Sequence, residues 1–369
     1  MAAYLYALSP LTWEYGGQTS EVFALNNCLC SCIVYLTCRL FTHNGGVMIT
    51  NIYLCLGAVL SGLCFSNQHS SLLFLVILIP YCFFTALTRM FSGQGNSEGK
   101  FDGKFESKGV IMAVTMANII ISFFIGVSPY YYLYHINQHP VKGSWGNLDS
   151  LNGLMKHIFR MEYGTFQLGV TRVGVEGVGE RLMAYVKHVN NESFYMAFPL
   201  LAIAIYYQYA YVQFPDKFVA KQVVEHPTKQ KKMKKTNTLN NSSEAITHSE
   251  SAPFIHRMLT SLFACLLNTW LFYTLIWHGV LSNLPLSSPM PYLVHARFWM
   301  QPSIILNILV GCGYGMVCML YNEHTATSQN IHTASLLNVV SVISVLLYLR
   351  FPVMNRSTSG WVMHNYGLA

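Results

Sequence analysis

The sequence has few charged residues, and none of them lies in its long apolar stretches. Only 10% of the 369 residues are charged, whereas 53% are hydrophobic. Eight apolar runs contain no Asp, Glu, Lys or Arg: 22–38, 47–65, 71–88, 109–134, 194–214, 258–294, 302–320 and 333–349. About 20 apolar residues cross a bilayer as a helix, and one charge at mid-span costs about 2.5–3.5 kcal/mol. The runs exclude a soluble protein and predict an all-α polytopic membrane protein with about eight transmembrane helices.

Several chemical signatures are also missing from the sequence. All ten cysteines lie inside the apolar runs, so no disulfide framework is implied. There is no His-Glu-x-x-His zinc motif, no Cys-x-x-Cys pair and no phosphate-binding loop. We therefore predict neither a metal nor a cofactor. The chain also lacks the basic start of a signal peptide, and its apolar beginning, 1–13, predicts a partial helix.

Basic residues are distributed unevenly between the loops. Thirteen Lys and Arg residues lie in loops 39–46, 89–108, 215–257 and 322–332. The opposite loops hold three, apart from the long loop 135–193. The positive-inside rule places the basic set in the cytosol and the opposite set in the lumen. The net charge of +7 thus reflects topology and does not indicate nucleic-acid binding.

These patterns divide the chain into six regions. They are an N-terminal transmembrane region (1–134), a large lumenal loop with an amphipathic helix (135–193), a transmembrane helix (194–214), a basic, disordered cytosolic loop (215–257), a C-terminal transmembrane region (258–353) and a lumenal tail (354–369). The cytosolic loop either is only solvated or contacts anionic lipids. Asn191 and Asn355 begin glycosylation sequons in the two lumenal regions.

The long lumenal loop is the only lumenal segment large enough to shape a pocket. Ser150 is expected to cap a helix over 151–161, whose apolar residues recur on one face as in a helix lying on a membrane surface. Arg160 and Glu162 follow at its end. They could bind a polar headgroup, or they could only pin the loop.

Three smaller polar clusters lie beside predicted spans on the same side of the membrane. Glu21 stands at the start of the first full span, where the helix dipole favours a carboxylate. His69 belongs to a tight Asn67-Gln68-His69 turn. Arg297 precedes aromatic residues and Gln301 at headgroup depth. Such an arginine can hold a lipid phosphate or merely snorkel to the interface.

The order of these clusters resembles one known family. The matching segments are Ser9-Pro10-Leu11-Thr12-Trp13, Glu21-Val22-Phe23-Ala24-Leu25-Asn26-Asn27, Asn67-Gln68-His69, Trp145-Gly146, Arg160 with Glu162-Tyr163-Gly164-Thr165-Phe166, and Arg297-Phe298-Trp299-Met300-Gln301. They resemble the transmembrane protein O-mannosyltransferases of the endoplasmic reticulum, which act on IPT domains of plexins and related receptors. The resemblance implies a GT-C-like fold.

The resemblance implies mannosyl transfer from dolichyl phosphate mannose to a Ser or Thr hydroxyl. Arg160 and Arg297 would then bind the lipid phosphate, because a fixed cation stabilises this leaving group. Trp145 and Tyr163 would stack on the sugar, and His69 and Gln301 would complete the substrate-binding set. The implied protein is a glycoprotein that spans the endoplasmic reticulum membrane several times.

One departure from the family concerns the catalytic base. The family's Asp-Ser-Gly-Glu stretch and its following His-Pro-Pro-Gly-Tyr turn do not occur in residues 1–369. The base is therefore unknown, with Glu21 and Glu162 as candidates, and the chain resembles the middle portion of such an enzyme. A non-catalytic membrane scaffold or truncated paralogue is the alternative. A transporter would usually carry charges inside its spans and show repeated halves, and we find neither.

Overall fold

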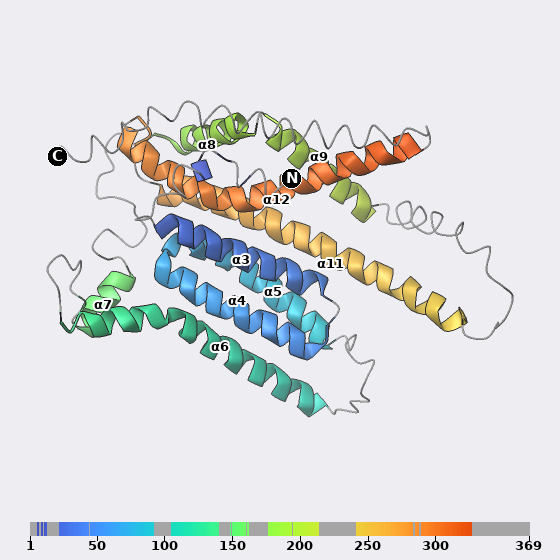
Figure 1. The fold of residues 1–369 in the computed structure, drawn as a ribbon, viewed down its shortest axis with the longest axis horizontal. Coiled ribbons are helices and arrows are strands. Elements are labelled where there is room, and N and C mark those ends of the chain that lie inside the picture. Colours follow the sequence, from blue (N-terminus) through green and yellow to red (C-terminus); the bar gives the residue numbers. More distant parts are fainter. Residues whose placement is uncertain are drawn as a thin grey trace. The chain divides into compact units, whose positions relative to one another are not determined.

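The computed structural model describes most of the predicted membrane-spanning part of the chain. The described residues are 6, 9, 11–12, 22–43, 45–91, 105–139, 148, 150–159, 161, 176–193, 195–213, 241–282, 285–287 and 289–326. These residues form helices and no strand (Figure 1). Six helical segments in this part are long and apolar enough to cross a membrane: Val22–Thr42, Val47–Asn67, His69–Met90, Gly109–Ile136, Leu259–Leu281 and Val294–Tyr321. The all-α polytopic membrane fold is confirmed.

The eight apolar runs agree with these spans in six cases. The run 194–214 forms α9, Ala197–Gln213, a helix of 17 residues that is not among the six spans. The run 333–349 lies outside the described residues. The expected number of about eight spans therefore becomes six in the part of the chain that the structure describes.

The run 258–294 contains one span, Leu259–Leu281, and continues beyond its end. Helix α11, Asn241–Ile276, passes into a π-helical turn, η2, at Trp277–Leu281, and α12 begins only at Pro289. Pro285 lies between them, and a proline cannot donate a helical hydrogen bond and disfavours helix in the residue before it. The next span, Val294–Tyr321, covers the run 302–320 and begins before it, so that Arg297 and Gln301 lie within α12.

The chain folds as two compact units. The larger unit contains residues 22–184 and 208–305, and the smaller unit contains residues 1–21, 185–207 and 306–369.

In the larger unit, helix α4 (Val47–Asn67) contacts both α3 (Val22–Thr42) and α6 (Phe105–Ile136). Helix α5 (Leu72–Phe91) contacts α3, α4 and α11. Figure 1 shows these helices running alongside one another. Because the connections between α3, α4 and α5 are short, successive helices run in opposite directions.

Several helices of the larger unit have contacts between their ends on one side of the bundle. The Asn67 side chain, at the end of α4, donates to the carbonyl oxygen of Val22 at the start of α3, at 3.1 Å. His69 lies 3.2 Å from the hydroxyl of Tyr130, near the end of α6. We call this end of the larger unit the polar end. The span Leu259–Leu281 also ends there.

Two glycines allow α4 and α6 to approach closely. A Cβ on Gly126 would overlap the carbonyl oxygen of Val59, and a Cβ on Gly62 would overlap the carbonyl oxygen of Phe123. Glycine at both positions lets the two backbones meet, which is a common way to pack helices in a membrane. In the smaller unit, Gly313 of α12 meets the backbone of Leu200 of α9 in the same manner.

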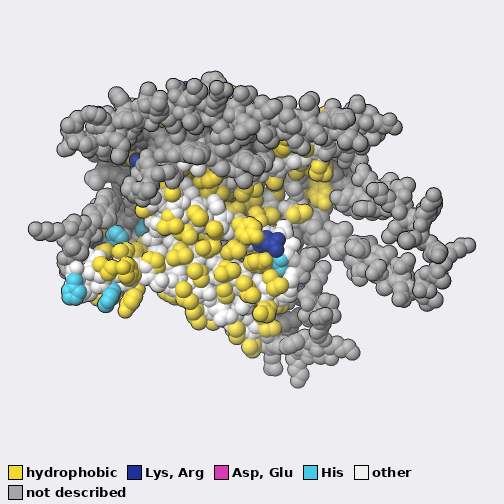
Figure 2. All heavy atoms as spheres, viewed as in Figure 1, with side chains coloured by type: hydrophobic (Ala, Val, Ile, Leu, Met, Phe, Trp, Pro, Cys, Tyr) yellow, Lys and Arg dark blue, Asp and Glu magenta, His cyan; other side chains and the backbone are white. Residues whose placement is uncertain are grey.

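The outer faces of the spans carry large apolar side chains. Phe84, Ile121 and Phe124 are 68%, 58% and 66% exposed. Hydrophobic side chains dominate the described surface visible in Figure 2. Such a large apolar surface would be unfavourable in water, whereas lipid chains can cover it.

A short helix stands in the loop expected to be lumenal. Helix α7, Leu151–Ile158, begins where Ser150 accepts a hydrogen bond from the amide of Gly153, at 3.1 Å. Leu154 is buried with Tyr130 of α6, while Leu151 is 68% exposed. The apolar face of α7 is therefore divided between the bundle and the surroundings.

Candidate functional site

A buried hydrogen-bond network centred on Gln301 lies at the polar end. Its amide nitrogen donates to the Gln68 side-chain oxygen at 3.3 Å and to the Ser70 hydroxyl at 2.9 Å. Its amide oxygen accepts from the Tyr273 hydroxyl at 2.5 Å. Gln301 has no exposed surface, so all these groups must be satisfied inside the protein. The network joins α12, α11 and the turn between α4 and α5.

A second part of the polar end contains a histidine whose two ring nitrogens are both engaged. The Trp299 indole N–H donates to His278 Nε2 at 2.9 Å, and His278 Nδ1 lies 2.8 Å from the carbonyl oxygen of Thr274. A carbonyl can only accept, so Nδ1 carries the hydrogen and the ring is neutral. His278 therefore links α11 to α12 and is poorly placed to act as a general base.

A buried arginine approaches the same end from α8, Val178–Glu192. Arg181 is only 8% exposed, and its guanidinium donates to the backbone carbonyl of Ser282. The Ser282 hydroxyl in turn lies 2.9 Å from Nδ1 of the fully buried His295. Burial lowers the pKa of Arg181, although the nearby charge of Glu176 opposes this effect. An arginine starts from so high a pKa that it remains a cation.

The carboxylate of Glu176 holds the segment between η2 and α12. Its oxygens accept from the backbone amides of Leu286 and Ser287, at 2.7 and 2.9 Å. Partial burial would raise the pKa of Glu176, but these hydrogen bonds prevail and hold it below its ordinary value. A carboxylate stabilised in this way is a weak base, so we assign Glu176 a positioning role.

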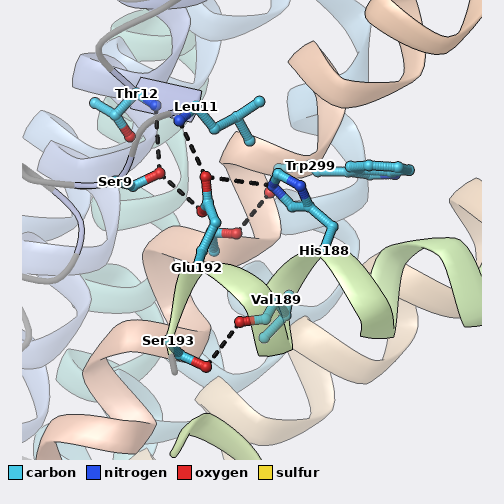
Figure 3. A network of polar contacts seen from close by, with 9 residues as sticks. Ser9, Leu11, Thr12, His188, Val189, Glu192, Ser193 and Trp299 are labelled. Atoms are coloured by element: carbon cyan, nitrogen blue, oxygen red, sulfur yellow. Dashed lines mark hydrogen bonds and ion pairs between the residues drawn. The ribbon is translucent and has the colours of Figure 1, made fainter. Parts of the chain in front are cut away.

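In the smaller unit, another carboxylate anchors the N-terminal segment of the chain (Figure 3). Glu192 accepts from the Ser9 hydroxyl at 2.8 Å and from the Leu11 amide at 3.0 Å. His188 Nε2 lies 3.5 Å from the same carboxylate, one turn earlier on α8. The Thr12 amide completes the turn by donating to the Ser9 hydroxyl at 3.3 Å. Glu192 thus fixes part of a segment that carried the family resemblance.

The structure describes three of the six predicted substrate-binding residues, and all three lie at the polar end. His69 contacts the Phe65 ring edge-on at a centroid distance of 5.0 Å, besides its contact with Tyr130. Gln301 is the centre of the buried network, and Arg297 stands one helical turn before it on α12, partly exposed. Their role in binding a substrate stays a prediction.

The other predicted site residues lie outside the described part of the chain: Trp145, Arg160, Tyr163, Asn355 and the candidate bases Glu21 and Glu162. Asn191 is described, and it is exposed in the last turn of α8. Its side-chain oxygen lies 3.4 Å from the Tyr195 hydroxyl, while the Ser193 hydroxyl of the same sequon donates to the carbonyl of Val189 at 2.7 Å. Glycosylation at Asn191 stays a prediction.

Sequence reasoning missed Arg181, Glu176 and His278. Only His278 left a usable signal, because a histidine inside an uncharged span is an expensive residue that often marks a functional site. Arg181 and Glu176 lie in a long loop among other polar residues, where nothing in the sequence distinguishes them.

Comparison with known proteins tests the family resemblance. The model of the protein O-mannosyl-transferase TMEM260 N-terminal domain matches residues 1–90. A protein O-mannosyl-transferase tmem260 of Dictyostelium discoideum is 26% identical over 322 residues, 85% of this chain. Protein O-mannosyl-transferase TMEM260 of Mus musculus is 24% identical over 358 residues, 96% of this chain. This chain is related to the TMEM260 protein O-mannosyl-transferases.

The family resemblance inferred from the polar clusters is thereby confirmed. The chain spans only 32% and 40% of the length of the two TMEM260 relatives. The segment matched by the TMEM260 family model includes Ser9, Gln68 and Ser70, so it contributes to both the N-terminal anchor and the Gln301 network. No solved structure matches this chain.

Replacing Gln301 with Leu should destabilise this TMEM260 relative strongly. The change removes the donor to the Gln68 side-chain oxygen and the Ser70 hydroxyl, while the Tyr273 hydroxyl keeps the Phe298 carbonyl as an acceptor; each unsatisfied buried group costs about 1–3 kcal/mol. The matched control is Gln208→Leu, because Gln208 is only partly buried and makes one described side-chain hydrogen bond, to Thr260 at 2.8 Å. Heating the purified protein in detergent and following monodisperse material by size exclusion measures both. Equal losses would contradict the central role of Gln301.

Proposed function

We propose that this chain is the membrane-embedded part of a glycosyltransferase that transfers mannose to Ser or Thr residues of acceptor proteins. The printed names of its relatives, protein O-mannosyl-transferase, support this activity. The described helices support a multi-pass membrane protein. The endoplasmic reticulum membrane and acceptors with IPT domains belong to the proposal, as does an orientation in which the polar end faces the lumen.

The donor in this proposal is dolichyl phosphate mannose. The observation that supports it is a partly open cavity of about 680 Å³ in the larger unit, lined by α3, α4, α5 and α6. Its wall is almost wholly apolar and includes Leu36, Leu78 and Phe123. Such a cavity within membrane spans suits a long hydrocarbon chain better than a sugar or a protein segment.

The cavity lies close to the polar end along the same helices. Ser61, in the cavity wall, precedes Gln68 by seven residues, and Leu75, also in the wall, follows Ser71 by four. At about 1.5 Å per helical residue, the cavity begins roughly 6–10 Å below the polar network. A lipid-linked sugar has this same division into an apolar chain and a polar head.

The proposed chemistry needs a base for the acceptor hydroxyl and a cation for the departing phosphate. The carboxylates of Glu176 and Glu192 already accept hydrogen bonds from protein groups. Glu21 and Glu162 therefore stay the candidate bases. Arg160 and Arg297 stay the proposed phosphate ligands, with Trp145 and Tyr163 against the sugar.

The test is a reconstituted transfer assay. The chain in nanodiscs receives dolichyl phosphate mannose carrying labelled mannose and an IPT-domain acceptor, with a Ser/Thr→Ala acceptor as control. We expect saturable donor binding, with transfer of label only to the acceptor that retains its hydroxyls. Donor binding without transfer would indicate a non-catalytic relative, and neither binding nor transfer would refute the proposal.

A further inference from the structure

We infer that Arg181 forms a binding site for a phosphate group at the polar end of the larger unit. On the proposed function, on which this assignment of the ligand's source rests, the phosphate is that of the lipid-linked donor. The inference is separate from Arg160 and Arg297, and it stands on the burial of Arg181, its unpartnered Nε and its depth in the membrane.

Arg181 has one buried hydrogen-bond donor, Nε, without a partner among the described residues. A guanidinium presents five N–H donors in a fixed plane. Among the described residues, the Arg181 guanidinium donates to one acceptor, the backbone carbonyl of Ser282. Its buried Nε has no hydrogen-bond partner there, although the side chain is 92% buried.

The positive charge of Arg181 also favours an anionic ligand. In the part of the chain that the structure describes, no carboxylate forms an ion pair with Arg181. Glu176 is close enough to influence it electrostatically, but the Glu176 oxygens accept from the amides of Leu286 and Ser287. A buried cation without a hydrogen-bonded counter-charge is strongly unfavourable, so this site favours an anion. A phosphate oxygen can accept from the unpartnered Nε–H, and a phosphate can use two guanidinium donors at once.

The start of α8 has space beside its two glycines. A Cβ added to Gly177 or to Gly179, which precede Arg181 at the start of α8, would meet nothing within 4 Å. The helix therefore begins beside open room. The Gly177 amide, directly before α8, already donates to the Glu180 carboxylate at 3.2 Å, so the attraction for an anion comes from Arg181 and not from the start of the helix.

Arg181 lies at the level where a membrane span ends. A Cβ on Gly279 of η2 would lie 3.9 Å from the side chain of Val178, so the first turn of α8 packs against the end of a span. Arg181 also contacts Ser282, the residue directly after that span. This level is where a lipid carries its phosphate, which favours a lipid phosphate over a free one.

The experiment compares Arg181→Gln and Arg181→Lys with Lys187→Gln, a change of an exposed cation on the same helix. Each full chain is reconstituted in nanodiscs and titrated with dolichyl phosphate, with dolichol, which lacks the phosphate, and with inorganic phosphate. We expect Arg181→Gln to raise the Kd for dolichyl phosphate at least tenfold and leave dolichol binding unchanged. Arg181→Lys should recover only part of the affinity, and Lys187→Gln should behave as wild type.

The three ligands distinguish the sources of the phosphate. Binding of inorganic phosphate that depends on Arg181, without such dependence for dolichyl phosphate, would support the anion site and assign it a free phosphate. An unchanged Kd for both phosphate ligands in a folded Arg181→Gln variant would overturn the site.

A measurement on the wild type covers the case in which the Arg181 variants do not fold. A ligand that binds only the folded state raises the unfolding temperature. Dolichyl phosphate should raise it more than dolichol, and equal shifts would overturn the inference.

If dolichyl phosphate binding depends on Arg181 but wild type transfers no mannose, the anion site stands and the proposed function fails. If wild type transfers mannose and Arg181→Gln leaves the donor KM unchanged, the proposed function stands and the anion site fails.

Discussion

Replacing Gly126 with Ala is expected to prevent stable folding of the larger unit. The new Cβ would overlap the carbonyl oxygen of Val59, and it would also lie 3.0 Å from the backbone nitrogen of Leu63. Because these neighbours are backbone atoms of α4, no side chain can rotate away, and the two helices must separate. Overpacking costs about 1–3 kcal/mol even where flexible side chains can adjust, so the loss here should be at least that large. Gly62→Ala should behave in the same way from the opposite helix.

The matched control for this prediction is Gly57→Ala, on the same helix as Gly62. A Cβ at Gly57 would meet nothing within 4 Å, so the change should leave stability nearly unaltered or improve it slightly through the higher helix propensity of alanine. The yield of monodisperse protein and its unfolding temperature in detergent measure all three variants. If Gly57→Ala lowers stability as much as Gly126→Ala does, the close contact between α4 and α6 does not explain the effect.

Filling the apolar cavity from Gly57 is expected to abolish high-affinity donor binding while the protein still folds. Gly57 lines the cavity and has free space at its Cβ position, so the phenyl ring of Gly57→Phe can enter the volume of about 680 Å³. A lipid chain that uses this volume would then be excluded. We expect the Kd for dolichyl phosphate mannose to rise more than tenfold.

The control for the cavity experiment is Gly109→Phe at the start of the fourth span. Gly109 is exposed, has open space at its Cβ position and does not line the cavity. It should bind the donor as wild type does. Titration of both variants in nanodiscs measures the effect, and unchanged donor affinity in a well-folded Gly57→Phe protein would remove the cavity from the proposed donor site.

The spans were predictable because the bilayer acts on composition alone. A charged side chain is costly in hydrocarbon wherever the neighbouring helices lie, so uncharged runs such as 47–65 and 109–134 coincide closely with observed spans. The end of the span inside the run 258–294 did not follow from charge, because residues 282–288 carry none. The prolines around this segment, rather than its polarity, end one helix before the next begins.

The candidate site was predictable only in part, for a related reason. His69, Arg297 and Gln301 stand at or near the ends of spans, so their approximate depth follows from the hydropathy pattern. Their partners do not follow from it. Gln301 bonds to Ser70 across 231 positions of sequence, and the approach of α12 to the turn between α4 and α5 depends on side-chain packing in three dimensions.

The sequence by itself determined that this protein is helical, crosses the membrane repeatedly and resembles the O-mannosyltransferases, because those properties depend on local hydrophobicity and on short polar motifs. The tertiary structure alone decided which polar groups meet. It brings Arg181 to Ser282 and Glu192 to Ser9, over separations of 101 and 183 residues. Hydrogen bonds and close helix contacts act over a few ångströms, so no local pattern in the chain records them.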